Sequence, residues 1–343
     1  MNNQLNIVPQ VVESSLFNLE PLAEEYESSL STLSGMRVLF RSDFGKEAIP
    51  LQNLENQVGE CPYQIRNFSS ESRERQIVAI DSSCALIGET EQGAIFAGRV
   101  AVATSKASKI TKYHRAGPFI FYFTMKYLSE QIKTALPPRA LRAIAGDNSL
   151  AERFIRTKLE RFAQILSART CRDSIILIDG ALKSSSLETR KHGLHELEEA
   201  AEENENQIIG IGKSTSLRVI VRAANLLQSF GSGESYFDIT ETLRFFCSCA
   251  EARILVARFS PNSPVFRVDA SRRNSENDSN VLADLKRNDF FFRGYPETLR
   301  FAHHLSVFDA STISSIRSYL SRKYGLVQVP SDDLRAMILG KLV

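Results

Sequence analysis

The chain has 343 residues, of which 43% are hydrophobic, 9% aromatic and 24% charged. These fractions are those of ordinary globular proteins, and they exclude wholesale disorder, collagen-like repeats and a disulfide-stapled mini-protein. The net charge of +2 makes no case by itself for a nucleic-acid or membrane partner. The length predicts one elaborated domain or two small ones.

Residues 1–75 are predicted to form an N-terminal appendage, helical at first and then irregular. Apolar residues recur at helical spacing between positions 10 and 35, and a polar stretch follows to about residue 75. The first residues lack the basic and apolar regions of a signal peptide, and no window reaches ~18 uninterrupted apolar residues. We therefore expect a cytoplasmic protein that does not interact with membranes.

The five cysteines fit a reducing compartment better than a disulfide framework, because they are odd in number and include no CxxC pair. Cys247 and Cys249 form a lone CxC motif. Without a second pair nearby, this motif favours buried thiols over a zinc site.

The first strands are predicted to form a β-hairpin that continues into a basic, aromatic stretch. Residues 77–80 are a β-branched run that ends in Asp81, and a second apolar run spans residues 94–102. From residue 92 to residue 129 there is no acidic residue, and cations alternate with aromatic rings. This composition suits nucleic acid, whose phosphates attract cations and whose bases stack on rings; the alternative is a solvated basic face beside a buried aromatic segment. The candidate nucleic-acid-binding residues are Arg99, Lys106, Lys109, Lys112 and Arg115.

The rest of the chain predicts an α/β fold, a mixed sheet flanked by helices. Strands are expected at residues 174–178 and 208–211, with an acidic helical insertion between them, and a hairpin at residues 254–258 and 264–268. Residues 271–280 are expected to form a polar loop. The expected helices span residues 149–168, 217–230, 297–307 and 312–324.

Two of the predicted strands each end in an aspartate, Asp81 and Asp179. If the strands are neighbours, both carboxylates converge on one edge of the sheet, where oxygen ligands suit Mg²⁺ or Mn²⁺. The third carboxylate should come from the helix that begins near Ser149. Glu152 is explained by a capping box with Ser149, so Glu160 is the preferred ligand, although Glu152 stays open as the alternative.

Three further residues are candidates for the same site. Tyr295 and His303 are separated by about two helical turns and could share one helix face, whereas His304 could be a satisfied core histidine. Lys213 follows the strand at residues 208–211, where it could offset phosphate charge. The motif around Lys213 lacks the first glycine of a P-loop, since position 207 is Gln207.

The order of these motifs resembles the NurA nuclease family over about residues 76–308. The motifs are Ile-Asp-Ser-Ser at 80–83, a helical glutamate, Ile-Asp-Gly at 178–180, Gly-x-Gly-Lys-Ser at 210–214 and Gly-Tyr-Pro followed by Ala-His at 294–303. One departure is Ser82, where the family commonly has glycine.

The resemblance implies an RNase H-like core that hydrolyses DNA with one or two Mn²⁺ or Mg²⁺ ions. It also implies a homodimer that works with a HerA-type hexameric ATPase in DNA-end processing, for recombination repair or for defence against foreign DNA. Matched residues give Asp81, Glu160, Asp179 and His303 as metal ligands, with Tyr295, His303 and Lys213 also in catalytic roles. Residues 76–308 would be the nuclease domain, and residues 309–343 a helical segment packed on it. The competing hypothesis is an inactive RNase H-like scaffold that binds DNA or a motor ATPase.

Overall fold

The computed structural model describes residues 37–38, 63–124, 126, 138–185, 188, 193–213, 218–230, 233–246 and 252–328. The helical pattern predicted for residues 10–35 and the Cys247–Cys249 motif lie outside these residues. The strands are β1 (Arg37–Val38), β2 (Arg66–Asn67), β3 (Gln76–Glu89), β4 (Gly93–Lys106), β5 (Lys109–Thr124), β6 (Ser174–Asp179), β7 (Gln207–Gly212), β8 (Ser235–Asp238), β9 (Ala252–Arg258), β10 (Phe266–Ser271), β11 (Phe291–Phe292), β12 (Tyr295–Pro296) and β13 (Val327–Gln328). The helices are α3 (Pro138–Gly146), α4 (Asn148–Thr170), α5 (Leu194–Glu203), α6 (Arg218–Phe230), α7 (Thr240–Phe246), α8 (Asp278–Asn288), α9 (Glu297–Ser306) and α10 (Ala310–Tyr324).

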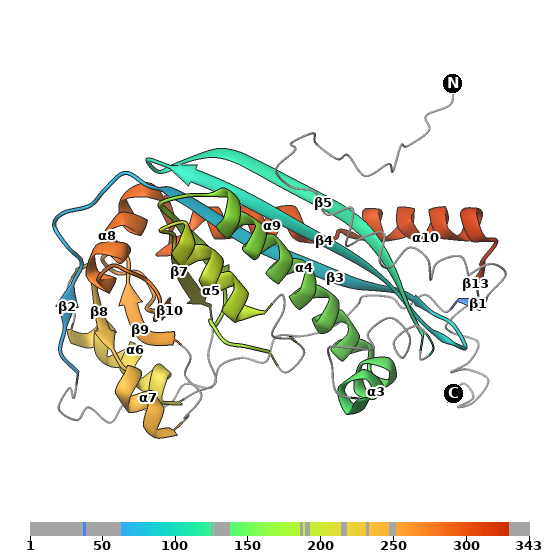
Figure 1. Ribbon diagram of the computed structural model, residues 1–343, viewed down its shortest axis with the longest axis horizontal. Coiled ribbons are helices and arrows are strands. Elements are labelled where there is room, and N and C mark those ends of the chain that lie inside the picture. The colour runs from blue at the N-terminus through green and yellow to red at the C-terminus, as the bar shows by residue number, and fades with distance from the viewer. Residues whose placement is uncertain are drawn as a thin grey trace, which may run out of the picture.

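Nine strands form one twisted sheet in the order β2-β8-β9-β10-β7-β6-β3-β4-β5 (Figure 1). Strands β3, β4 and β5 are an antiparallel meander, whereas β6 runs parallel to β3 and β7 runs parallel to β6. A meander followed by two parallel strands, in the order β5-β4-β3-β6-β7, is the arrangement of an RNase H-like core. The predicted mixed α/β fold is confirmed, and β10, β9, β8 and β2 extend the sheet antiparallel beyond β7.

The two faces of the sheet are covered by different helices because successive strand residues point to opposite sides. Val78 and Ile80 of β3 belong to the core under α4, α5 and α6, whereas Ile77 and Ala79 belong to the core under α8 and α9. A third cluster joins α10 to the far ends of β3, β4 and β5. Helix α9 therefore lies on the odd-numbered face of β3, which is the face that includes Asp81.

Three sequence predictions need correction. Asp81 does not end its strand: β3 continues to Glu89, because the residues after Asp81 keep pairing with β4. The predicted loop at 271–280 contains the end of β10 and the start of α8, which Asn277 caps through Ser279 N. Ser149 does not cap α4; the cap is Asp147, whose carboxylate accepts hydrogen bonds from the two backbone amides that follow Asn148.

Among the described residues, no helix has the length and apolar composition needed to cross a membrane.

Candidate metal centre

Asp81, Asp179 and His303 bring one ligand atom each to within 4.8 Å of the others. The parallel pairing of β3 with β6 explains the first two positions, because Ile80 lies beside Ile178 and each aspartate follows its partner directly. Asp179 is the last residue of β6, and Gly180 then turns the chain with a positive φ of 109°. The prediction that these two carboxylates converge agrees with this geometry.

Helix α9 brings His303 to Asp81. Its Nδ1 lies 3.1 Å from Asp81 Oδ2, and Ser306, one turn further along, donates a hydrogen bond of 2.6 Å to the same oxygen. Burial of Asp81 opposes ionisation, but the hydrogen bonds from His303 and Ser306 outweigh it and hold the pKa of Asp81 below 3.8. The same hydrogen bond raises the pKa of His303 above 6.5. Asp81 is therefore an ionised carboxylate with one oxygen already oriented.

Asp179 is held by two other side chains. Lys213 Nζ donates to Asp179 Oδ2 at 2.8 Å, and the Tyr295 hydroxyl donates to Asp179 Oδ1 at 3.1 Å. The Lys213 ammonium also lies 5.2 Å from the centre of the Tyr295 ring. Burial, together with the charge on Asp179, raises the pKa of Tyr295, so its hydroxyl stays a donor. Lys213, at the end of β7, is thus placed to offset negative charge at Asp179.

Tyr295 reaches the site by a different route from the one expected. It lies in the short strand β12, and α9 begins only at Glu297. Tyr295 and His303 therefore do not share a helix face, although they hydrogen-bond to neighbouring aspartates. His304 is exposed on α9, so it is not a core histidine.

Glu160 lies beside this cluster but is not one of its three closely spaced donors. Its carboxylate accepts hydrogen bonds from Ser82 Oγ at 3.1 Å and from Gln164 Nε2 at 3.0 Å. Burial, with the charge on Asp81, raises the pKa of Glu160 to about 7. Glu152 instead accepts a hydrogen bond from the backbone amide of Leu86 on β3, at 3.1 Å. Glu160 is thus hydrogen-bonded to Ser82, the residue next to Asp81, and the charge on Asp81 acts on its carboxyl group.

Two residues that support the site were not predicted from the sequence. Ser306 bridges Asp81 and the His303 carbonyl, and its position one turn after His303 was the available signal. Ser82 continues β3 without a turn and links that strand to α4 through Glu160 and the Arg156 carbonyl. A serine at position 82, in place of the glycine noted above, thus leaves β3 intact and adds a hydrogen bond to the Glu160 carboxylate.

The five predicted nucleic-acid-binding cations do not share one surface. Arg115 of β5 is the cross-strand partner of Ala101 on β4, which is in turn the partner of Asp81 on β3. Arg115 therefore points to the α9 face of the sheet, as Asp81 does. Lys112 aligns with Thr104 and Val78 and points to the opposite face.

The other three cations have different surroundings. Arg99 is 6% exposed, donates to the Val307 carbonyl at 3.0 Å and packs over the Phe308 ring at 4.2 Å. Burial and the charge of Arg115 lower the pKa of Arg99 to about 10. Lys106 forms an ion pair of 3.1 Å with Glu74, and Lys109 is exposed opposite Lys106 at the end of the β4–β5 hairpin. Lys109, Lys112 and Arg115 are therefore exposed along the edge strand β5, and Lys106 is exposed at the end of β4. Arg99 is a buried residue that ties β4 to the end of α9.

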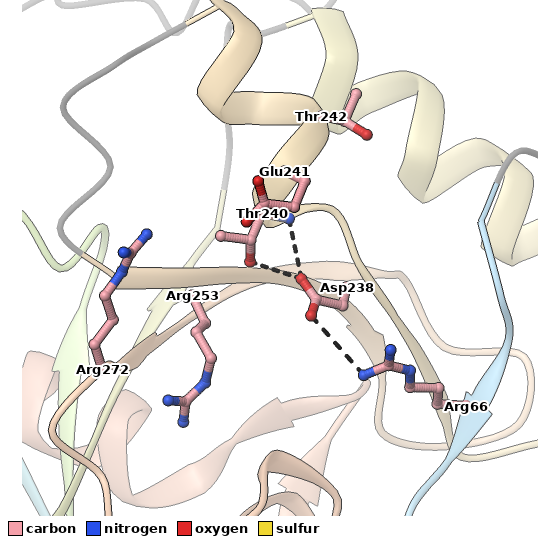
Figure 2. A pocket seen from close by; sticks show the side chains of 7 residues that line it. All are labelled: Arg66, Asp238, Thr240, Glu241, Thr242, Arg253 and Arg272. Carbon is pink, nitrogen blue, oxygen red and sulfur yellow. Dashed lines mark hydrogen bonds and ion pairs between the residues drawn. The ribbon is translucent and has the colours of Figure 1, made fainter.

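A pocket lies at the other edge of the sheet, away from Asp81 and Asp179 (Figure 2). Arg66 of β2 pairs with Asp238 at 3.8 Å, and Arg253 of β9 forms a bidentate pair with Asp278. Two of the arginines in this pocket are thus neutralised by aspartates. The pocket has no residue in common with the candidate metal centre. Its lining residues are Arg66, Asp238, Thr240, Glu241, Thr242, Arg253 and Arg272.

A family model described as the NurA domain matches residues 75–308. No curated protein shows significant sequence similarity. Similar solved structures include the NurA nuclease from Sulfolobus solfataricus, with 15% identity, coverage of 76% of this chain and 87% of that chain, and a TM-score of 0.46. A NurA bound to dAMP and manganese has 10% identity, coverage of 71% and 87%, and a TM-score of 0.43. The catalytic domain of human endonuclease V has 13% identity, coverage of 74% and 85%, and a TM-score of 0.36.

Proposed function

Since the chain belongs to the NurA family, we propose that it is a divalent-metal-dependent nuclease that hydrolyses phosphodiester bonds of DNA. The observation that carries this proposal is the convergence of Asp81, Asp179 and His303 from three separate elements. Two carboxylates and an imidazole around one point form a donor set for Mn²⁺ or Mg²⁺.

The charges at the site fit a cation. Asp81 is ionised, and its charge, together with burial, raises the pKa of the neighbouring Glu160 carboxyl to about 7. A divalent ion between these groups would offset that repulsion and ionise Glu160. When bound, one or two such ions would supply a water molecule of lowered pKa and would neutralise charge on the phosphate oxygens.

The chain's own residues have distinct roles in this proposal. Asp81, Asp179 and His303 would hold the metal, with Glu160 as a further ligand once it is ionised. In the alternative, His303 does not bind the ion and accepts or donates a proton beside Asp81, to which its Nδ1 is hydrogen-bonded. Tyr295, whose hydroxyl stays protonated, would orient the scissile phosphate or the attacking water, and Lys213 would offset phosphate charge.

The biological setting that we propose comes from family membership. The protein would act in the cytoplasm as a homodimer, with a HerA-type hexameric ATPase, to process DNA ends in recombination repair or in defence against foreign DNA. Arg115, Lys112 and Lys109, exposed along β5, would contribute to DNA binding. The support for this binding role is the acid-free sequence of β4 and β5.

The test is cleavage of end-labelled single- and double-stranded linear DNA by the purified chain in Mn²⁺, Mg²⁺ or EDTA, with and without a HerA-type ATPase. We expect metal-dependent cleavage that Asp81→Asn and Asp179→Asn each reduce by at least about 100-fold. Asp269→Asn is the matched control, because this aspartate is buried on β10, two strands from β6, and pairs with Arg267. Absence of cleavage by the wild type, with DNA or ATPase binding intact, would replace the nuclease with the scaffold hypothesis.

A further inference from the structure

Two phenylalanine rings at strand β11 are exposed. Phe290 and Phe292 are 55% and 45% exposed, respectively. The residue between them, Phe291, points the other way and stacks on Phe259 with 4.7 Å between ring centroids. This buried contact holds the strand, while the rings on either side remain about half exposed.

The hairpin that contains Phe292 is rigid. Its two turn residues, Arg293 and Gly294, have φ values of 52° and 78°, as in a type I′ turn. A Cβ atom at Gly294 would lie 2.5 Å from Ser263 Oγ, so the turn is packed closely against the β9–β10 loop. The hairpin therefore presents Phe292 in one fixed orientation.

Phe292 faces the side of the hairpin that reaches the metal centre. It is the cross-strand partner of Tyr295, and directly paired residues project from the same face. The Tyr295 hydroxyl bonds to Asp179, so the Phe292 ring lies on the same side as the proposed metal ligand.

Two arginines lie against the exposed ring. Arg300 and Arg293 have their guanidinium carbons 4.8 Å and 5.5 Å from its centre. Glu297 fixes the Arg300 guanidinium through hydrogen bonds of 2.6 Å and 2.7 Å. Arg300 precedes His303 by three residues on α9, so both side chains project from the same flank of the helix, about one turn or ~5 Å apart.

We propose that Phe292 stacks on an unpaired nucleobase of the DNA strand that is cut at Asp81 and Asp179. An exposed ring beside Arg293 and the Glu297-bound Arg300 recognises flat, electron-rich rings attached to a negatively charged backbone. A base stacked on Phe292 has left its duplex partner, as in a single strand, at a frayed end or after flipping out of a duplex. The inference rests on the proposed nuclease function and adds the residue that positions the strand being cut.

The first test combines variants of Phe292 with abasic substrates. Single-stranded oligonucleotides have an abasic residue at each nucleotide near the mapped cleavage site, and kcat/KM is measured for each. For the wild type, one abasic position should lower kcat/KM by about 5- to 150-fold. Phe292→Leu, which keeps an apolar side chain but cannot stack, should show the same loss on intact DNA and no further loss at that abasic position.

Two other variants control for stability and for general loss of an aromatic residue. Phe292→Trp should retain the wild-type rate within about 3-fold and the same abasic sensitivity. Tyr319→Ala removes a ring that is 42% exposed and has Lys323 over it at 5.4 Å, but on α10 rather than beside α9 (Figure 1). This control should match the wild type on every substrate. If every abasic position lowers the kcat/KM of Phe292→Leu by the same factor as that of the wild type, the two losses are independent and the proposal is overturned.

A second measurement does not depend on cleavage. Single strands with 2-aminopurine at each position are bound to the protein in EDTA, and the quenching of 2-aminopurine fluorescence reports stacking. Quenching at one position that is lost in Phe292→Leu and kept in Tyr319→Ala supports the proposal even if the wild type cleaves nothing, in which case only the nuclease function fails. Cleavage by the wild type with no position quenched through Phe292 overturns the stacking proposal alone.

Discussion

Asp289 couples the stability of α9 to pH, and this coupling can be measured. Asp289 is 2% exposed and ends α8. Its carboxylate accepts hydrogen bonds from the Thr298 hydroxyl at 2.7 Å and from the Thr298 amide at 3.2 Å. Pro296, at the N-cap position of α9, has no side-chain cap hydrogen bond. The Asp289 carboxylate instead accepts the hydrogen bond from the Thr298 amide that an N-cap side chain would normally accept.

The expected magnitude follows from the pKa of this carboxyl. Burial raises the pKa of Asp289 from 3.8 to about 7. Between these two values the folded protein holds a proton that the unfolded chain has lost, so the free energy of unfolding falls as pH rises. At about 1.4 kcal/mol per pKa unit, the fall between about pH 5 and pH 8 is about 2 to 3 kcal/mol.

The assay is urea unfolding of the wild type and Asp289→Asn at both pH values. An asparagine does not ionise here, so the variant should lack this fall of about 2 to 3 kcal/mol. Asp309→Asn is the matched control: Asp309 caps α10, and its hydrogen bond with the Thr312 amide lowers its pKa to about 2. Asp309 is therefore ionised at both pH values in the folded and unfolded states, and its loss should have the same effect at each. The same pH response in the wild type and Asp289→Asn would refute the reasoning.

Three further predictions concern the candidate metal centre. Glu160→Gln should lower the cleavage rate by about 10-fold or more with little change in melting temperature. Glu152→Gln weakens the hydrogen bond from Leu86 N, so it should mainly lower the melting temperature. The reverse pattern would make Glu152 the relevant carboxylate. Tyr295→Phe should lower kcat by about 10- to 100-fold, the value of one hydrogen bond to a charged group, and an unchanged kcat would remove the tyrosine from the mechanism. Mn²⁺ at about 100 times its Kd should raise the free energy of unfolding of the wild type by about 2.7 kcal/mol, and EDTA should reverse this effect. If Mn²⁺ stabilises the Asp179→Asn variant as much as the wild type, the metal does not bind at this site.

The local pattern of the sequence determined the strands that form the site. Apolar β-branched runs before Asp81 and Asp179 predicted two strands, and their parallel pairing places both aspartates together. The periodicity of α4 was equally readable, because a buried helix stripe and a buried strand each have a fixed repeat. These features depend on neighbours in the chain, which is why the sequence predicts them.

Tertiary structure decided which side chains complete the site. Ser306 reaches Asp81, and Tyr295 reaches Asp179, only because α9 and the β11–β12 hairpin pack beside β3 and β6. No local pattern encodes such contacts between residues more than 100 positions apart.

The cations of the hairpin illustrate the same limit. In the sequence they form one basic stretch, but strand alternation sends Arg115 and Lys112 to opposite faces of the sheet. Arg99 is buried because residues 307 and 308, from the end of α9, cover it. Charge composition is a property of the chain, whereas the surface on which each charge lies depends on register and on the elements that pack over it.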